Sequence, residues 1–202
     1  DKLSAKDNAK RYFDRYQKMK RTREALEQQI EEGRQRLWHL DSISQALSMA
    51  ENEGDLSAIR KEMQDYGYIG SHSEKGGRRK QELRSEPMHF ISSDDIDIYV
   101  GRNNYQNEEL SFRLSDPSDW WFHAKGVPGS HVIARTGARE LPDATCLEAA
   151  ALAAYYSRSG GEDKVEVDYV QRKELRRVPK GAPGYVIYHT NYSIVIEPRS
   201  KI

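Results

Sequence analysis

The sequence has little of several features that mark whole classes of protein. Its 202 residues include one cysteine, Cys146, so no disulfide can form within the chain, which suits a reducing cytosol. No apolar run approaches the roughly 20 residues that span a bilayer, and neither a signal peptide nor a lipidation motif is present. We therefore expect a cytoplasmic location, with signal-less display on a cell surface left open, and no insertion into a membrane.

The sequence also lacks an excess of charge of either sign. It contains 32 Lys and Arg against 32 Asp and Glu, which gives a formal net charge of zero. This balance argues against a chain that coats nucleic acid by bulk charge, but it permits a local basic face. A mean hydropathy of −0.90 is typical of a chain that contains a long solvated helix. Because the chain begins at Asp1 rather than methionine, we expect it to be part of a longer protein.

Residues 1–69 are predicted to form a helical arm. The first 66 residues contain no proline, and apolar or aromatic side chains recur at spacings of three and four, as in a coiled coil or helical hairpin. These positions are Tyr12, Tyr16, Met19, Leu26, Ile30, Leu37, Leu40, Ile43 and Leu47. Asp55 is expected to cap a short second helix that Gly67 closes. The arm is interpreted as a spacer that folds back on itself, or alternatively as a surface that pairs with a second copy.

Residues 70–87 are predicted to form a basic flexible linker. Residues 70–73 (GSHS) and Gly76–Gly77 break regular structure here, and Arg78, Arg79, Lys80 and Arg84 supply positive charge. A solvated tether explains this composition. A flexible arm that touches phosphates is the alternative.

Residues 88–202 are predicted to form a compact sheet domain with one main packed helix, which makes the whole chain α+β. The expected strands cover residues 96–100, 110–114, 120–124, 131–135, 165–170, 185–189 and 193–197. One alanine-rich helix is expected at residues 147–156, with Thr145 and Glu148 as a capping box and Gly160–Gly161 as its end. Cys146 is assigned to packing rather than to chemistry.

The densest group of aromatic and basic side chains lies at residues 119–125 (DWWFHAK). In a strand, Trp121, His123 and Lys125 share one face, and an aromatic ring beside cations is what a nucleobase and its phosphate require. The alternative is that Trp121 and His123 fill the rim of a core. The two interpretations stay equally open.

Two further polar groups flank this strand. Arg102, Asn103, Asn104, Gln106 and Asn107 follow an expected strand, where a hairpin loop with positive φ explains the two adjacent asparagines. A basic run comes later and consists of Arg172, Lys173, Arg176, Arg177 and Lys180. Such a run is usually a solvated face, but beside the aromatic strand it is able to complete a phosphate-binding surface.

The sequence gives no support for catalysis or for a cofactor. Ser130 and His131 are adjacent and point apart in a strand, and nothing marks Ser130 as a nucleophile. Asp119, His123 and His131 lack the spacing of a metal site. We therefore expect a binding protein that is not an enzyme and that holds neither a metal nor a cofactor.

Several of these motifs together resemble the NFACT-R domain. The matching segments are residues 100–104 (VGRNN), 106–107, 119–125, 128–132 (PGSHV), 148–150, 167–169, Lys173 and 183–188 (PGYVIY). Residues 8–13, 16–20 and 59–62 resemble the coiled-coil middle region of the same family. The chain is thus similar to the C-terminal half of RqcH-type proteins, also called fibronectin-binding protein A.

This resemblance implies two sets of partners. RqcH-type proteins bind the large ribosomal subunit and tRNA and add an alanine tail to stalled chains, with the N-terminal domain, absent here, associated with tRNA recruitment. Some members are described as anchorless surface adhesins that bind fibronectin and sometimes fibrinogen. The expected role is therefore RNA binding in ribosome quality control, with adhesion as a second role. An adhesin fragment without an RNA role, or a structural stalk, is the alternative.

The residues expected to contact RNA come from all three polar groups. They are Arg102, Asn103, Asn104, Gln106, Asn107, Trp121, His123, Lys125, His131, Lys173, Arg176 and Arg177. The arginines and lysines are expected to contact phosphate, and Trp121 or His123 to stack on a base. The sequence indicates no surface for fibronectin.

Overall fold

The computed structural model describes residues 4–70, 85–179 and 181–202. Its contacts divide the chain into two compact units, residues 1–40 and residues 41–202. The boundaries expected at residues 69 and 87 both fall within the second unit and stay predictions. Most of the expected linker, including Arg78, Arg79, Lys80 and Arg84, lies outside the described residues.

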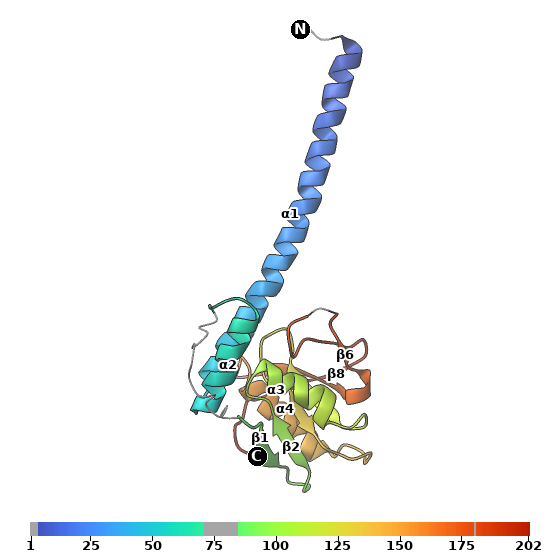
Figure 1. Ribbon diagram of the computed structural model, residues 1–202. Helices are drawn as coiled ribbons and strands as arrows, with labels where there is room; N and C mark the ends of the chain where they lie inside the picture. The colour runs from blue at the N-terminus through green and yellow to red at the C-terminus, as the bar shows by residue number, and fades with distance from the viewer. Residues whose placement is uncertain (1–3, 71–84, 180) are drawn as a thin grey trace. The chain divides into compact units, whose positions relative to one another are not determined.

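The first unit consists of most of helix α1, which spans Ala5–Ser48 (Figure 1). Ser4 caps the helix, since its hydroxyl accepts the backbone N–H of Asp7 at 3.1 Å. The predicted apolar stripe is exposed along this unit, with Tyr12 and Leu37 both 65 % exposed. The long helix is confirmed, and its pairing with a second copy stays a prediction.

The second unit opens with a helical hairpin. The last residues of α1 and helix α2 (Glu53–Asp65) share a small apolar core of Ile43, Ala46 and Ile59. The cap of α2 differs from expectation, because Asn52 rather than Asp55 accepts the hydrogen bond, from the N–H of Asp55 at 3.0 Å. Gly67 ends the segment with a φ of +70°, a conformation that glycine adopts without strain.

An antiparallel sheet of six strands forms the centre of the second unit. The strands run in the order β1-β2-β4-β3-β5-β8. Their bounds are Met88–Ile91 (β1), Asp97–Val100 (β2), Trp120–Ala124 (β3), Val132–Ala134 (β4), Val165–Gln171 (β5) and Tyr192–Ile196 (β8). A separate ribbon pairs β6 (Arg176–Arg177) with β7 (Val186–Ile187). The α+β class is confirmed.

The two faces of the sheet bury different sets of side chains, as the alternation in residues 120–124 predicts. Phe122 and Ala124 pack with helix α4 (Asp143–Tyr155), whose alanines allow close approach to the sheet. Trp121 points to the opposite face and packs with Leu110 and Leu175. Cys146 lies at the edge of the α4 core and burial raises the pKa of its thiol, in agreement with a packing role.

Three further local predictions are wrong. Residues 110–114 form a π-helical turn, η1 (Leu110–Leu114), that continues helix α3 (Asn104–Glu109), rather than a strand. Asn103 is the extended N-cap of α3, with a φ of −153° rather than a positive one. The proposed capping box is absent, since α4 begins at Asp143, two residues before Thr145. Thr145 and Glu148 instead bond to the loop at residues 92–94.

Candidate nucleic-acid interface

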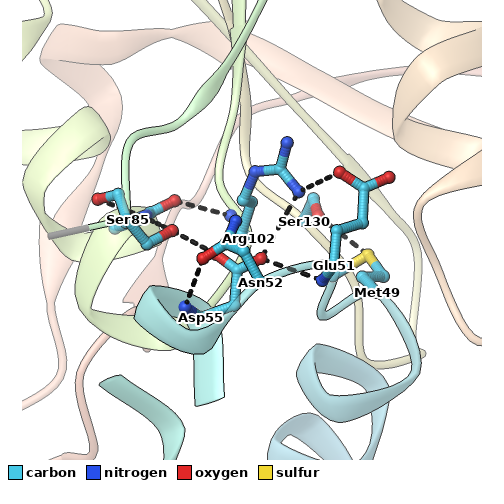
Figure 2. Close-up of polar contacts among 8 residues, drawn as sticks. Met49, Glu51, Asn52, Asp55, Ser85, Arg102 and Ser130 are labelled. Atoms are coloured by element: carbon cyan, nitrogen blue, oxygen red, sulfur yellow. Dashed lines mark hydrogen bonds and ion pairs between the residues drawn. The ribbon is translucent and has the colours of Figure 1, made fainter. Parts of the chain in front are cut away.

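The first predicted group of polar residues, at positions 102–107, contacts helix α2. We call Arg102, Asn103, Asn104, Gln106 and Asn107 the α2 socket. Figure 2 shows Arg102 between two acidic residues, with its Nη1 2.9 Å from Glu51 Oε2 and 3.6 Å from Asp55 Oδ2. Asp55 is 1 % exposed and also accepts the backbone N–H of Glu51 and the hydroxyl of Ser85. The guanidinium is therefore used to neutralise a buried carboxylate.

The asparagine next in the socket contacts both helices of the hairpin. The amide nitrogen of Asn104 donates to Ser42 Oγ at 2.8 Å and to Glu62 Oε1 at 2.7 Å. Glu62 is fully buried, so the bond satisfies a charge that water cannot reach. Tyr105 adds a 2.6 Å bond from its hydroxyl to Asp65, which together with burial raises the pKa of the phenol.

The remaining residues of the α2 socket form hydrogen bonds to neighbouring segments of the chain. Gln106 donates to the carbonyl and hydroxyl oxygens of Ser85, both at 2.9 Å. Asn107 accepts the backbone N–H of His131 at 3.0 Å, and a side chain on Gly101 would bring a Cβ within 2.2 Å of the same oxygen. Asn103 caps α3 through its Oδ1. Contact of the socket with RNA stays a prediction, but most of its polar groups already bind within the protein.

The aromatic strand β3 places its rings in the interior. Trp121 is fully buried, stacks on His123 with 5.5 Å between ring centroids, and meets His131 edge-on at 5.1 Å. His131 Nδ1 lies 2.7 Å from the hydroxyl of Ser111. In this arrangement Trp121 offers no exposed face to a base. His123 is only partly exposed, and its contact with RNA stays a prediction.

The two histidines make the fold sensitive to acid. Burial lowers the pKa of His123 to about 4, and burial beside His123 lowers the pKa of His131 well below its usual value. Below about pH 6.5 these histidines bind protons in the unfolded chain but stay neutral in the folded chain. The free energy of unfolding therefore falls as the pH falls, by about 1.4 kcal/mol per pH unit for each histidine.

Urea unfolding at pH 7.5, 6.5 and 5.5 measures this dependence. We expect stability to be level above pH 6.5 and to fall below it, with a shallower fall in His123→Gln. The matched control is His89→Gln, because the His89 side chain is 45 % exposed. An equal fall of stability with pH in both variants would contradict the assignment of the acid sensitivity to His123.

Lys125 lies at the end of β3 beside a polar group on β5. Its ammonium is 2.6 Å from Glu166 and 3.8 Å from Asp168, and the hydrogen bond to Glu166 raises its pKa. Asp168 is nearly buried and also accepts the hydroxyls of Tyr188 and Ser193. Lys125 is half exposed, so its outer face remains open to solvent.

The basic run collects beside Phe112 on η1. The guanidinium of Arg177 lies 4.2 Å from the centre of the Phe112 ring, and that of Arg172 lies 5.6 Å from it. We call Phe112, Arg172, Lys173, Arg176 and Arg177 the Phe112 platform. Arg172 also donates to the carbonyls of Ser111 and Phe112, and Arg177 pairs with Glu108.

Three cations of the Phe112 platform are exposed, and one of them, Arg177, is paired with Glu108. Lys173 and Arg176 are exposed, and in the described part of the chain neither has a carboxylate partner. Lys180, the last member of the predicted run, lies outside the described residues. Of the three predicted groups, the basic run therefore presents the most accessible positive charge.

The described residues contain neither a cluster suited to a metal ion nor a helix suited to a membrane. No group of three or more His, Cys, Asp or Glu side chains in residues 4–70, 85–179 and 181–202 is arranged to hold a metal ion. Within the same ranges, no helix is both long and apolar enough to cross a membrane.

Comparisons with known proteins agree over nearly the whole chain. Residues 1–82 match the family model of the NFACT N-terminal and middle domains, and residues 86–189 match the NFACT protein RNA binding domain. The chain is 38 % identical over 200 residues to the Rqc2 homolog RqcH of Streptococcus pneumoniae, covering 98 % of this chain and 35 % of that protein. It is 34 % identical over 193 residues to the RqcH of Bacillus subtilis, covering 95 % and 33 % respectively.

A solved structure agrees with the fold as well. It is the C-terminal part of the fibronectin/fibrinogen-binding protein from Streptococcus suis, with a TM-score of 0.85 and 33 % sequence identity over 99 % of this chain and 78 % of that one. The chain spans about a third of the length of the curated RqcH relatives. On these matches, the chain belongs to the NFACT family, as a counterpart of the middle and RNA-binding regions of RqcH proteins.

Proposed function

We propose that this chain is a non-catalytic RNA-binding part of a ribosome quality control protein. Support comes from the match of residues 86–189 to an RNA-binding domain and from relatives named as RqcH. A relative in Drosophila melanogaster, 32 % identical over 157 residues (77 % of this chain and 14 % of that protein), is named as a subunit homologue of the ribosome quality control complex. The expected partners are tRNA and the large ribosomal subunit.

The observation that carries the proposal is the Phe112 platform. Lys173 and Arg176, its exposed cations without a carboxylate partner among the described residues, are available to neutralise phosphates and so release counterions, which is the main source of sequence-independent affinity for nucleic acid. Arg172 and Arg177 lie against the Phe112 ring, and Arg172 also donates to the backbone carbonyls of Ser111 and Phe112. Because the net charge of the chain is zero, RNA binding needs a local positive surface of this kind.

The test is a titration of the chain with labelled tRNA at about 50 and 200 mM salt. We expect Lys173→Glu/Arg176→Glu to weaken binding at least about tenfold at low salt and to reduce the slope of log affinity against log salt by about 1 for each lost phosphate contact. The control is Lys164→Glu/Arg199→Glu. It makes the same charge change beyond the opposite end of β5, where Val165 pairs with Ile196. Equal affinity in both variants would sink the platform as the RNA site.

Fibronectin binding is the second candidate, favoured by the description of the Streptococcus suis structure. A fibronectin site independent of the Phe112 platform predicts saturable binding to immobilised fibronectin that persists at 200 mM salt and is unchanged in Lys173→Glu/Arg176→Glu. Absence of saturable binding at that salt would remove this candidate.

A further inference from the structure

A polar concavity is lined by residues of α2, of the start of α3 and of η1. It has a volume of about 830 Å³, within the range of ligand sites in proteins. Its walls include Arg60 and Lys61 from α2, Asn103 and Tyr105 at the start of α3, and Arg113 from η1. We call it the α2–α3 groove. None of its wall residues belongs to the Phe112 platform.

The α2–α3 groove contains positively charged side chains that form no ion pair among the described residues. Arg60, Lys61 and Arg113 are exposed, and no described carboxylate pairs with any of them. The groove also contains two carboxylates, Asp65 and Glu109. Asp65 accepts the hydroxyl of Tyr105 at 2.6 Å, so its oxygen is already engaged. Three cations against two carboxylates leave the groove net positive.

Asn103 gives an independent indication of a ligand. It is only 3 % exposed, yet its amide nitrogen has no hydrogen-bond partner among the described residues. Its orientation is fixed, because Oδ1 accepts the N–H of Gln106 at 3.0 Å to cap α3. Buried donors are nearly always paired, and an unpaired one costs about 1–3 kcal/mol. An acceptor bound in the groove would satisfy it.

The π-helical turn connects the α2–α3 groove with the Phe112 platform. Phe112 and Arg113 are consecutive, and the ring of Phe112 contacts Arg172 and Arg177 while Arg113 lines the groove. One extended strand of nucleic acid that crosses η1 would therefore meet both surfaces. A groove of this volume has room for a few nucleotides of a single strand.

We propose that the α2–α3 groove binds the backbone of a single RNA strand. Arg60, Lys61 and Arg113 contact phosphates, and Asn103 donates to a phosphate or base oxygen. The proposal rests on the RNA-binding function above and extends it from the sheet domain to α2, so that the helical hairpin takes part in binding.

The sharpest test is Asn103→Asp. Aspartate keeps the oxygen that caps α3, since Asp and Asn are equally good N-caps, but it replaces the free donor with negative charge. Because the Asn103 site is only 3 % exposed, the new carboxylate is expected to lower the melting temperature, and the folded variant is expected to lose at least a tenfold factor of affinity for a labelled single-stranded RNA of about ten nucleotides at about 50 mM salt. The control is Asn191→Asp, the same change at an exposed turn before β8.

A second variant keeps the test valid if Asn103→Asp does not fold. Arg60→Ala/Lys61→Ala/Arg113→Ala removes three exposed cations and is expected to weaken RNA binding by a similar factor. If both groove variants bind RNA like the unmodified chain while Lys173→Glu/Arg176→Glu does not, the groove proposal is wrong and the platform stands. If the unmodified chain binds no RNA, the proposed function and the groove proposal both fail.

Discussion

Replacing Trp121 with alanine is expected to lower the free energy of unfolding by about 3–5 kcal/mol, the range found for large aromatic residues in a core. Trp121 is fully buried and belongs to the apolar cluster of Leu110, Ile133, Val170 and Leu175. Its ring also stacks on His123 and contacts Tyr188 at 5.4 Å between centroids. Removal of the indole leaves a cavity in this cluster that the neighbouring side chains fill only in part.

The control for this prediction is Trp38→Ala. Trp38 is 40 % exposed, so its loss is expected to cost less than half as much. Urea unfolding monitored by circular dichroism gives both values. The variant Trp121→Leu separates packing from base stacking, because leucine keeps an apolar side chain in the core but has no ring to stack on a base, and it is expected to leave RNA affinity unchanged. A stable Trp121→Ala protein that loses RNA binding would restore the stacking hypothesis.

The alternation of side chains along the strands predicted most of the sheet, because successive side chains pack into the apolar clusters on its two opposite faces. At residues 120–124 the alternation assigned Phe122 and Trp121 to opposite faces, and both are buried there. Strand β1 was not predicted. It is an edge strand of four residues, paired only with β2 and half buried, so its sequence carries little periodic signal.

The error at residues 110–114 has a specific cause. Leu110, Phe112 and Leu114 alternate with polar residues as a strand would, but five residues are too few to exclude a helix. The preceding Asn103 decides the outcome, because its side chain caps α3 and the helix then runs on into the π turn. Asparagine suits both a helix cap and a turn, so the residue type alone did not distinguish them.

The candidate site was harder to predict than the fold. A polar residue that binds RNA and one that binds a buried helix look alike in a sequence. The α2 socket shows this, since Asn104 contacts Ser42 and Glu62, residues about 40 to 60 positions away. The α2–α3 groove was missed for the same reason, because Arg60 and Arg113 meet only once α2 lies beside α3.

Replacing Arg102 with alanine is expected to destabilise the second unit by about 3 kcal/mol, near the lower limit for breaking a buried ion pair. Asp55 would remain 1 % exposed without its cation, although the bonds from Glu51 N–H and Ser85 would persist. The loss is expected to concentrate in α2, so hydrogen exchange at residues 53–65 should accelerate more than in the sheet. Arg102→Lys, which keeps the charge, is expected to recover part of the stability.

Arg158→Ala is the matched control and shows why burial decides the size of the effect. Arg158 lies 2.8 Å from Asp41, closer than Arg102 lies to Asp55, but the two side chains are 60 % and 47 % exposed. Water screens that pair, so its loss is expected to cost less than about 1 kcal/mol. If the two variants are equally stable, Asp55 does not depend on Arg102, and the hydrogen bonds from Asn104 to Glu62 and from Tyr105 to Asp65 would have to hold α2 in place on their own.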